Sequence, residues 1–112
     1  MDLTTERHDN VLSIGVRGRL DWSNSDTFKD AIKDTIEETD RAVIMDFAEL
    51  DFIGSAGLRV VLLAAKSLFE RDAKLLLCSL SDPVREVFRV TGFERLLPIH
   101  ETPAEARASL DR

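Results

Sequence analysis

The stretch that decides the fold is DFAELDFIGSAGLR, from Asp46 to Arg59. An apolar run of strand length, Ala42 to Phe47, leads into it. Small residues, Gly54 to Gly57, then give way to a long apolar segment, Leu58 to Phe69. This order is typical of a strand, a tight turn and a helix. Ser55 therefore lies at the turn, near the start of the predicted helix.

Three roles fit the hydroxyl of Ser55. Backbone N–H groups at the start of a helix lack intrahelical partners, and the helix dipole favours negative charge there. The hydroxyl can therefore cap the helix or contact a bound anion. It can also carry a phosphate, which adds about −1.5 to −2 charge at pH 7. Spacing alone favours the cap.

Length and composition limit the class of protein. The chain has 112 residues, and we expect a single domain over residues 1–112. Its net charge of −6 argues against nucleic acid and anionic membranes as main partners. The N-terminal residues lack the basic and apolar parts of a signal peptide, and no apolar run approaches the ~20 residues of a membrane span. We therefore expect a cytoplasmic protein with no membrane insertion.

Apolar periodicity predicts an α/β fold. Residues 2–9 form an expected edge strand, and Val11 to Gly18 alternate between apolar and polar, so the His8-Asp9-Asn10 turn between them predicts a hairpin. Strands are then expected to alternate with helices, which predicts a mixed, mainly parallel sheet of four to five strands with about four covering helices. The later strands are expected at 42–47, 74–78 and 96–99, and the helices at 23–40, 58–71, 82–91 and 102–110.

Two loops follow strands and are expected to meet at one end of the sheet. They are Asp21–Ser25 and Phe52–Gly57. Trp22, the only tryptophan, is equally consistent with an exposed interface anchor and with a core residue. Arg59 either pairs with an acid on a partner or is a surface residue of the helix with no role in binding. Phe52 is expected in the core.

No pattern for catalysis, metal binding or cofactor binding is evident. His8 and His100 are far apart in the sequence and are expected at the surface. The Gly54-to-Gly57 spacing is too short for a phosphate-binding loop. Leu58 occupies the place of the last glycine of a hydrolase nucleophile elbow. We therefore expect a protein that is not an enzyme and needs no metal or cofactor.

Three blocks of sequence resemble STAS domains, in the branch of bacterial anti-sigma factor antagonists. Phe52 to Arg59 resembles the signature turn of that branch, with Ser55 at the position of its phosphorylated serine. Gly18-Arg19-Leu20-Asp21 resembles its Gly-x-Leu/Ile-Asp strand ending, and Ser81 to Phe93 resembles its later helix with a terminal glycine. The blocks occur in the family's order and span nearly the whole chain. Gly54 departs from the Asp or Ser that is common before the serine.

The resemblance implies a STAS fold with helices mostly on one face of the sheet. It implies an anti-sigma factor antagonist that binds an anti-sigma factor with ATP-dependent serine kinase activity when Ser55 is unphosphorylated. That partner would phosphorylate Ser55 and release the product, a serine phosphatase would restore it, and ATP and Mg²⁺ would belong to the partner. The expected partner-binding residues are Asp21, Trp22, Ser23, Ile53, Gly54, Ser55, Ala56, Gly57, Leu58 and Arg59.

Two other functions stay open at this point. Some short STAS proteins are subunits of ABC-type lipid transport complexes and bind the transporter's ATPase, and there Ser55 would be an interface residue without turnover. The third function is a sensor that binds a small ligand or nucleotide. Neither the composition nor the motifs separate the sensor from the other two.

Overall fold

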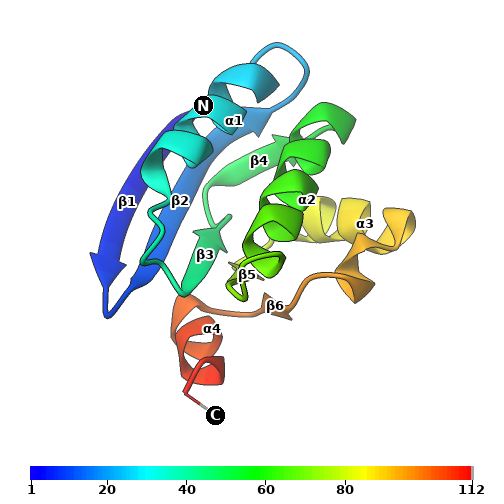
Figure 1. Ribbon diagram of the computed structural model, residues 1–112. Helices are drawn as coiled ribbons and strands as arrows, with labels where there is room; N and C mark the ends of the chain where they lie inside the picture. The colour runs from blue at the N-terminus through cyan, green and yellow to red at the C-terminus, as the bar shows by residue number, and fades with distance from the viewer. Residues whose placement is uncertain (112) are drawn as a thin grey trace.

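The computed structural model describes residues 1–111, which form a sheet with four α-helices around it (Figure 1). The strands are β1 (Asp2–His8), β2 (Val11–Leu20), β3 (Ala42–Asp46), β4 (Leu50–Ile53), β5 (Lys74–Cys78) and β6 (Ile99–His100). The helices are α1 (Ser25–Thr35), α2 (Ser55–Phe69), α3 (Asp82–Thr91) and α4 (Pro103–Ser109), with a short 3₁₀-helix at Phe93–Arg95. Among the described residues, no helix has both the length and the apolar content to cross a membrane.

The sheet topology confirms the predicted fold class. The strand order is β1-β2-β3-β5-β6, and β4 pairs with β2 beyond the end of the β2–β3 ladder. Only β1 and β2 are antiparallel, joined by the predicted turn, in which Asp9 and Asn10 have positive φ. The strand count of four to five was too low, because the sheet has six strands. The additional strand is β4, which lies in the segment predicted to lead into the turn before the second helix.

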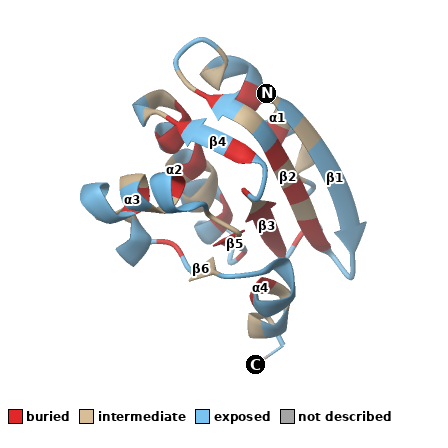
Figure 2. Cartoon of the chain, turned by 180° about the vertical axis from the view of Figure 1, so that it is seen from behind, coloured by how far each residue is buried: buried red, intermediate tan, exposed pale blue. Residues whose placement is uncertain are grey.

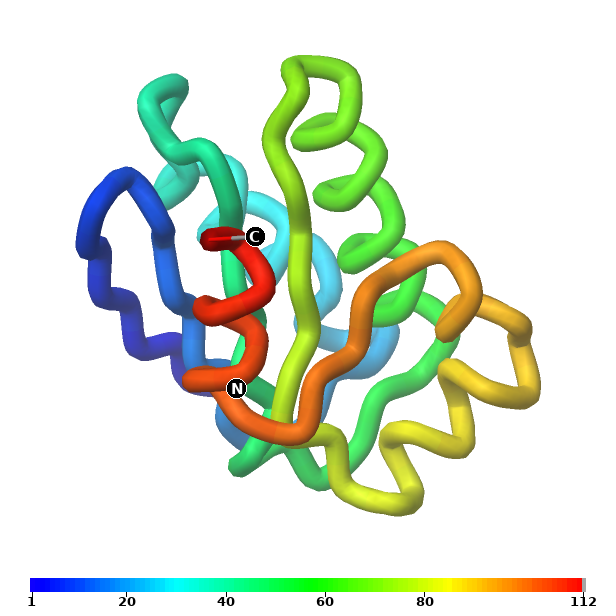
Figure 3. The backbone as a smooth tube through the Cα atoms, turned by 90° about the horizontal axis from the view of Figure 1, so that it is seen from below, coloured from blue at the N-terminus to red at the C-terminus, as the bar shows by residue number. Residues whose placement is uncertain are grey.

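Helices cover the two faces of the sheet unequally. On one face, Phe28 and Ile32 of α1 and Val61 and Leu68 of α2 pack on the inward side chains of β2, such as Ile14 (Figure 2). On the other face, α4 lies across β3, β5 and β6 (Figure 3). The small cluster beneath α4 consists of Val11, Ala42, Ile44, Leu76, Cys78 and Ala106. Most helical cover therefore lies on one face, as the resemblance implied.

Several predicted helix boundaries were wrong at their ends. Asn24, not Ser23, is the N-cap of α1, and that helix ends at Thr35. Ser81, not Asp82, caps α3 by accepting a hydrogen bond from the Val84 N–H, although Gly92 ends the helix in the left-handed conformation as predicted. The last strand is Ile99–His100, because the 3₁₀-helix occupies the preceding segment. The predicted cap of α4 at Thr102 is confirmed.

A buried ion pair closes the end of the sheet at which β3 begins. Asp40 is 1% exposed. Its two carboxylate oxygens accept hydrogen bonds from Nε and Nη2 of Arg7 at 2.7 and 2.8 Å, and Oδ2 also accepts from the Glu37 N–H at 2.8 Å. The Arg7 hydrogen bonds hold the pKa of Asp40 below its ordinary value. The carboxylate therefore stays charged and joins the first strand to the loop before β3.

Candidate functional site

The two predicted loops do meet at one end of the sheet. β2 and β4 run parallel with Leu20 opposite Ile53, and both strands end there. The Gly54 N–H donates to the Leu20 carbonyl at 2.8 Å, which holds the start of α2 against the end of β2. The first turn of α2 and the Asp21–Ser25 loop consequently lie at the same end of the molecule, and we call their exposed face the site surface (Figure 1).

The residues beneath this surface are tightly packed. Leu20, Ile53, Gly57 and Leu58 are all buried. A Cβ on Gly57 would lie 2.8 Å from the Leu20 Cβ and 3.3 Å from the Leu20 carbonyl oxygen, which is too close for any side chain. Glycine is therefore required at position 57, because the backbone of α2 approaches β2 directly. Close packing of α2 against β2 therefore explains why this turn has a glycine at position 57.

Ile53, Gly57 and Leu58 thus lie in the interior, although they were proposed as partner-binding residues. They shape the site from beneath and present no surface to a partner. The expectation for Phe52 was also wrong, since this side chain is 40% exposed and not in the core. Among the predicted residues around the helix start, Ser55 and Arg59 are exposed, while Gly54 and Ala56 are partly exposed.

Ser55 is the first residue of α2 and not its cap. Gly54 occupies the N-cap position with extended φ and ψ, and no side chain caps this end of the helix. No hydrogen bond from the Ser55 hydroxyl is present among the described residues, and the first turn carries no acidic side chain. The capping role that the spacing favoured is therefore wrong. The hydroxyl is exposed at a helix start with free N–H groups.

Asp21 is held in place by its own loop. The Ser23 N–H and hydroxyl both donate to Oδ1 of Asp21, at 2.9 and 2.5 Å, and the Asp21 N–H donates to Oδ1 of Asn24 at 3.0 Å. Hydrogen bonds from Ser23 lower the pKa of Asp21 below its ordinary value. The carboxylate is therefore ionised at neutral pH. Ser23, expected to start the helix, instead orients this acid.

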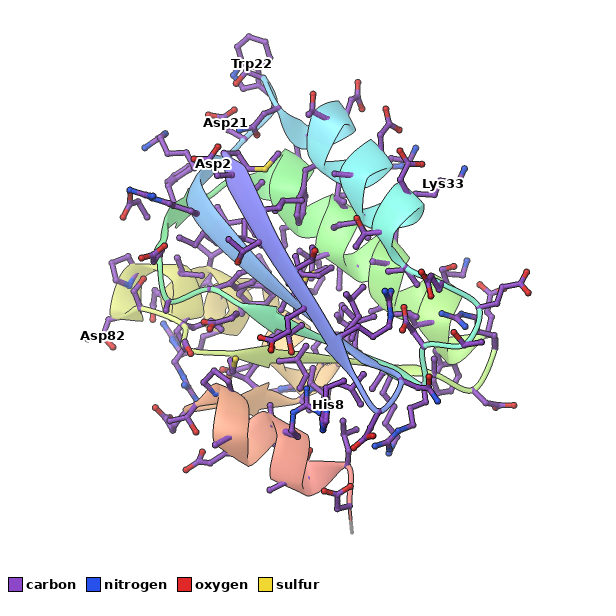
Figure 4. All side chains as sticks on the ribbon, turned by 90° about the vertical axis from the view of Figure 1, so that its left-hand side faces the viewer. Asp2, His8, Asp21, Trp22, Lys33 and Asp82 are labelled. Atoms are coloured by element: carbon purple, nitrogen blue, oxygen red, sulfur yellow. The ribbon has the colours of Figure 1, made fainter. Side chains whose placement is uncertain are left out.

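Trp22 projects from the same loop into solvent. Its exposed fraction is 84%, and the side chain points away from the body of the molecule beyond Asp21 (Figure 4). Between the two alternatives for this residue, the structure selects the exposed one. An indole in open solvent contributes no packing to the fold, so its surface is available to a partner.

Arg19 and Phe52 were not predicted as site residues, and the structure adds them. They are opposite each other in the β2–β4 pairing. The guanidinium carbon of Arg19 lies 4.3 Å from the centre of the Phe52 ring, a cation–π contact. Arg19 Nε is also 3.9 Å from Oδ2 of Asp21. The only available signal was the position of Arg19 beside Asp21, because β4 itself was not predicted.

Metal binding has no evident place in the described chain. Across residues 1–111, no group of three or more His, Cys, Asp or Glu side chains has an arrangement that would hold a metal ion. The polar groups gathered at the carboxyl ends of β2 and β4 are a hydroxyl, carboxylates and arginines.

Comparisons with known proteins agree with the geometry. The model of the STAS domain family matches residues 2–106. A relative from Bordetella bronchiseptica, named "Putative anti-sigma factor antagonist BtrV", is 36% identical over 109 residues, covering 97% of this chain and 94% of the relative. An anti-sigma F factor antagonist of Paenibacillus polymyxa is 23% identical, covering 99% and 96%.

The fold is also shared with solved structures. The crystal structure of an anti-sigma factor antagonist from Mycobacterium paratuberculosis superposes with a TM-score of 0.89 at 21% identity, covering 99% of this chain and 94% of that one. The family match over most of the chain, the relative at 36% identity and the shared topology lead to one conclusion. The chain belongs to the STAS domain family.

Proposed function

We propose that this chain is an anti-sigma factor antagonist that works by partner switching and is not an enzyme. In its unphosphorylated form it binds an anti-sigma factor with ATP-dependent serine kinase activity and thereby releases a sigma factor. Phosphorylation of Ser55 ends the binding, and a serine phosphatase restores it. The names of the similar proteins support the class of function. The observation that carries the switch is the Ser55 hydroxyl at the start of α2, which is exposed and makes no hydrogen bond within residues 1–111.

The proposed interface is the exposed part of the surface around Ser55. Its members come from the loop after β2 and from the start of α2: Asp21, Trp22, Ser23, Gly54, Ser55, Ala56 and Arg59. Trp22 offers a large apolar side chain, and aromatic anchors of this kind dominate the binding energy of many interfaces. The buried Ile53, Gly57 and Leu58 hold the helix start in position beneath it.

The phosphorylation step needs nothing from this chain except an accessible nucleophile. Ser55 Oγ would lose its proton and bond to the γ-phosphorus of the partner's ATP, with ADP as the leaving group. Mg²⁺ and the catalytic base would come from the partner. The new phosphate would carry about −1.5 to −2 charge at pH 7 and stand on the same surface as the ionised Asp21. Two like charges in an interface disfavour the complex, so release needs no change of fold.

The test is affinity capture from the native cytoplasm with three baits: the unmodified protein, Ser55→Ala and Ser55→Asp. We expect the first two to retain an ATP-binding kinase that mass spectrometry identifies, and Ser55→Asp to retain at least tenfold less. Ser67→Asp is the matched control, since Ser67 is also exposed on α2 but lies three turns away. That substitution should leave capture unchanged.

The result also separates the alternative. Capture of an ABC transporter ATPase by all baits would replace the switch with a structural subunit of a lipid transport complex. Equal capture of a kinase by Ser55→Ala and Ser55→Asp would reject the phosphorylation switch, because Ser55 charge would then have no effect on binding.

A further inference from the structure

Arg19 stands at the end of β2 that holds the start of α2. The end of β2 crosses under the start of α2, with the Leu20 carbonyl bonded to the Gly54 N–H at 2.8 Å. Leu20 points into the core, so its neighbours Arg19 and Asp21 point outward. The Phe52 ring, over which Arg19 stacks at 4.3 Å, lies 3.3 Å from the position of a Cβ on Gly54. One aromatic ring therefore separates the guanidinium from the residue that precedes Ser55.

The hydrogen-bond donors of Arg19 are free. In the described part of the chain, its side chain makes no hydrogen bond, and its nearest acid is Asp21, at 3.9 Å from Nε. The side chain is 61% exposed. A guanidinium can donate two N–H groups at once to one phosphate. Arg19 is thus an available cation that the fold leaves without a strong partner.

Arg59 supplies a second free cation from the helix itself. It stands four residues after Ser55 in α2, which places both side chains on one face of the helix. An acid that precedes a base by four residues is the favourable orientation for an ion pair on a helix. Arg59 is exposed, and no ion pair to it occurs within residues 1–111. A negative charge on Ser55 would be the first partner for this guanidinium.

We propose that Arg19 and Arg59 form an intramolecular clamp that binds the phosphate once Ser55 is phosphorylated. The inference rests on the proposed phosphorylation and adds the groups that receive the phosphate. Arg19 would leave the Phe52 ring to reach the phosphate, and Phe52 would lose its cation. The partner would then meet two changes on this surface, a new anion and an uncovered aromatic ring. Asp21 is the nearby charge that opposes the clamp.

The clamp is tested on protein that carries phosphoserine at position 55, introduced during translation so that no kinase is required. The second ionisation of the phosphate is followed by ³¹P NMR in the wild-type chain, Arg19→Gln, Arg59→Gln and the double variant. An opposite charge nearby lowers a pKa by about 1–3 units. We therefore expect each single variant to raise the phosphate pKa by about half a unit to one unit, and the double variant to raise it further.

Arg17→Gln is the matched control, because it removes the same charge from the same strand. Arg17 lies in a different hollow, with Asp2, Asp46 and Glu49, and should leave the phosphate pKa unchanged. Equal values in all variants would overturn the clamp, and a shift in only one of the two arginine variants would reject a clamp of two. A second readout is the ring-current shift of the Arg19 side-chain protons, which phosphorylation should abolish. Persistence of that shift would also reject the proposal.

The clamp and the partner switch can fail separately in these experiments. If phosphorylation lowers partner affinity while the arginine variants leave the phosphate pKa unchanged, the switch stands without the clamp. If the arginines do shift the pKa but phosphorylation leaves partner affinity unchanged, the clamp stands and partner switching fails.

Discussion

Two aspartates at opposite ends of the sheet both have a lowered pKa, but their surroundings differ. Asp40, before β3, and Asp21, after β2, both have a pKa below the ordinary value of 3.8 because of hydrogen bonds to the carboxylate. Asp40 is bound by the long side chain of Arg7 from another strand and is 1% exposed. Asp21 is bound by Ser23, two residues away, in an open loop.

The comparison shows that a lowered pKa does not by itself mark a functional acid. Asp40 connects segments that are 33 residues apart and is removed from water, so its charge has a structural role. The bonds to Asp21 are local and leave the carboxylate at the surface next to Trp22, in the loop that we propose as part of the interface. Exposure and the range of the hydrogen bonds distinguish the two roles.

The largest expected effect is the loss of the buried pair. Asp40→Ala removes the acceptor of the Arg7 and Glu37 hydrogen bonds. We expect the free energy of unfolding to fall by about 3 kcal/mol, at the low end for breaking a buried pair, because Arg7 is partly exposed and can rehydrate. Urea unfolding measures this loss in the free energy of unfolding. Asp21→Asn is the comparison variant, and an equal loss of stability there would contradict the distinction between the two acids.

The next effect concerns the packing of Gly57 beneath the site. Gly57→Ala would place a methyl group 2.8 Å from the Leu20 Cβ, and we expect a loss of about 1–3 kcal/mol despite the higher helix propensity of alanine. The matched control is Gly54→Ala, whose methyl group would lie 3.3 Å from the edge of the Phe52 ring and 3.8 Å from the Leu20 carbonyl oxygen. We expect the control to cost less than about 1 kcal/mol. A Gly57→Ala protein as stable as the wild type would show that α2 does not approach β2 this closely.

Much of this architecture was predictable from the sequence, and the failures have physical causes. Alternation in β2, the buried run of β3 and the turn at Asp9 were strong signals, and each element formed. β4 was not predicted because only its two ends, Leu50 and Ile53, are buried, so its four residues show neither alternation nor an apolar run. Its pairing depends on a bulge in β2 between Gly18 and Arg19, which no local pattern reveals.

The site was predictable in outline and less so in detail. Both loops lie where switch-point reasoning placed them, because strand order fixes which strand ends coincide. The exposure of individual residues depends on packing across elements. Phe52 is exposed while its neighbour Ile53 is buried. Gly54, not Ser55, occupies the N-cap position of α2, and its N–H donates to the Leu20 carbonyl. These are long-range contacts, and a single sequence does not encode them in any short pattern.

A smaller effect is expected on the titration of Asp21. Ser23→Ala removes the hydroxyl that donates to the carboxylate, so the pKa of Asp21 should rise toward 3.8. Because the folded-state pKa lies below the unfolded one, the stabilising contribution of Asp21 is present above about pH 4 and is lost as pH falls through the folded pKa. NMR titration of the carboxyl carbon measures the shift. A pKa for Asp21 that is the same in both proteins would exclude the Ser23 hydroxyl as the main cause.

The smallest effect on stability, and the one most specific to function, is expected at Trp22. With 84% of its surface exposed, the indole contributes little to the fold, and Trp22→Ala should change the free energy of unfolding by no more than about 0.5 kcal/mol. Affinity for the captured partner should nevertheless fall by at least tenfold, because a truncated aromatic anchor costs about 2 kcal/mol or more. Val90→Ala is the control, because Val90 is an apolar residue of α3 that is 68% exposed, and the substitution should change neither quantity. If Trp22→Ala binds as tightly as the wild type, the interface does not extend over the loop that holds Asp21, and the charge on that acid then has no partner surface to repel.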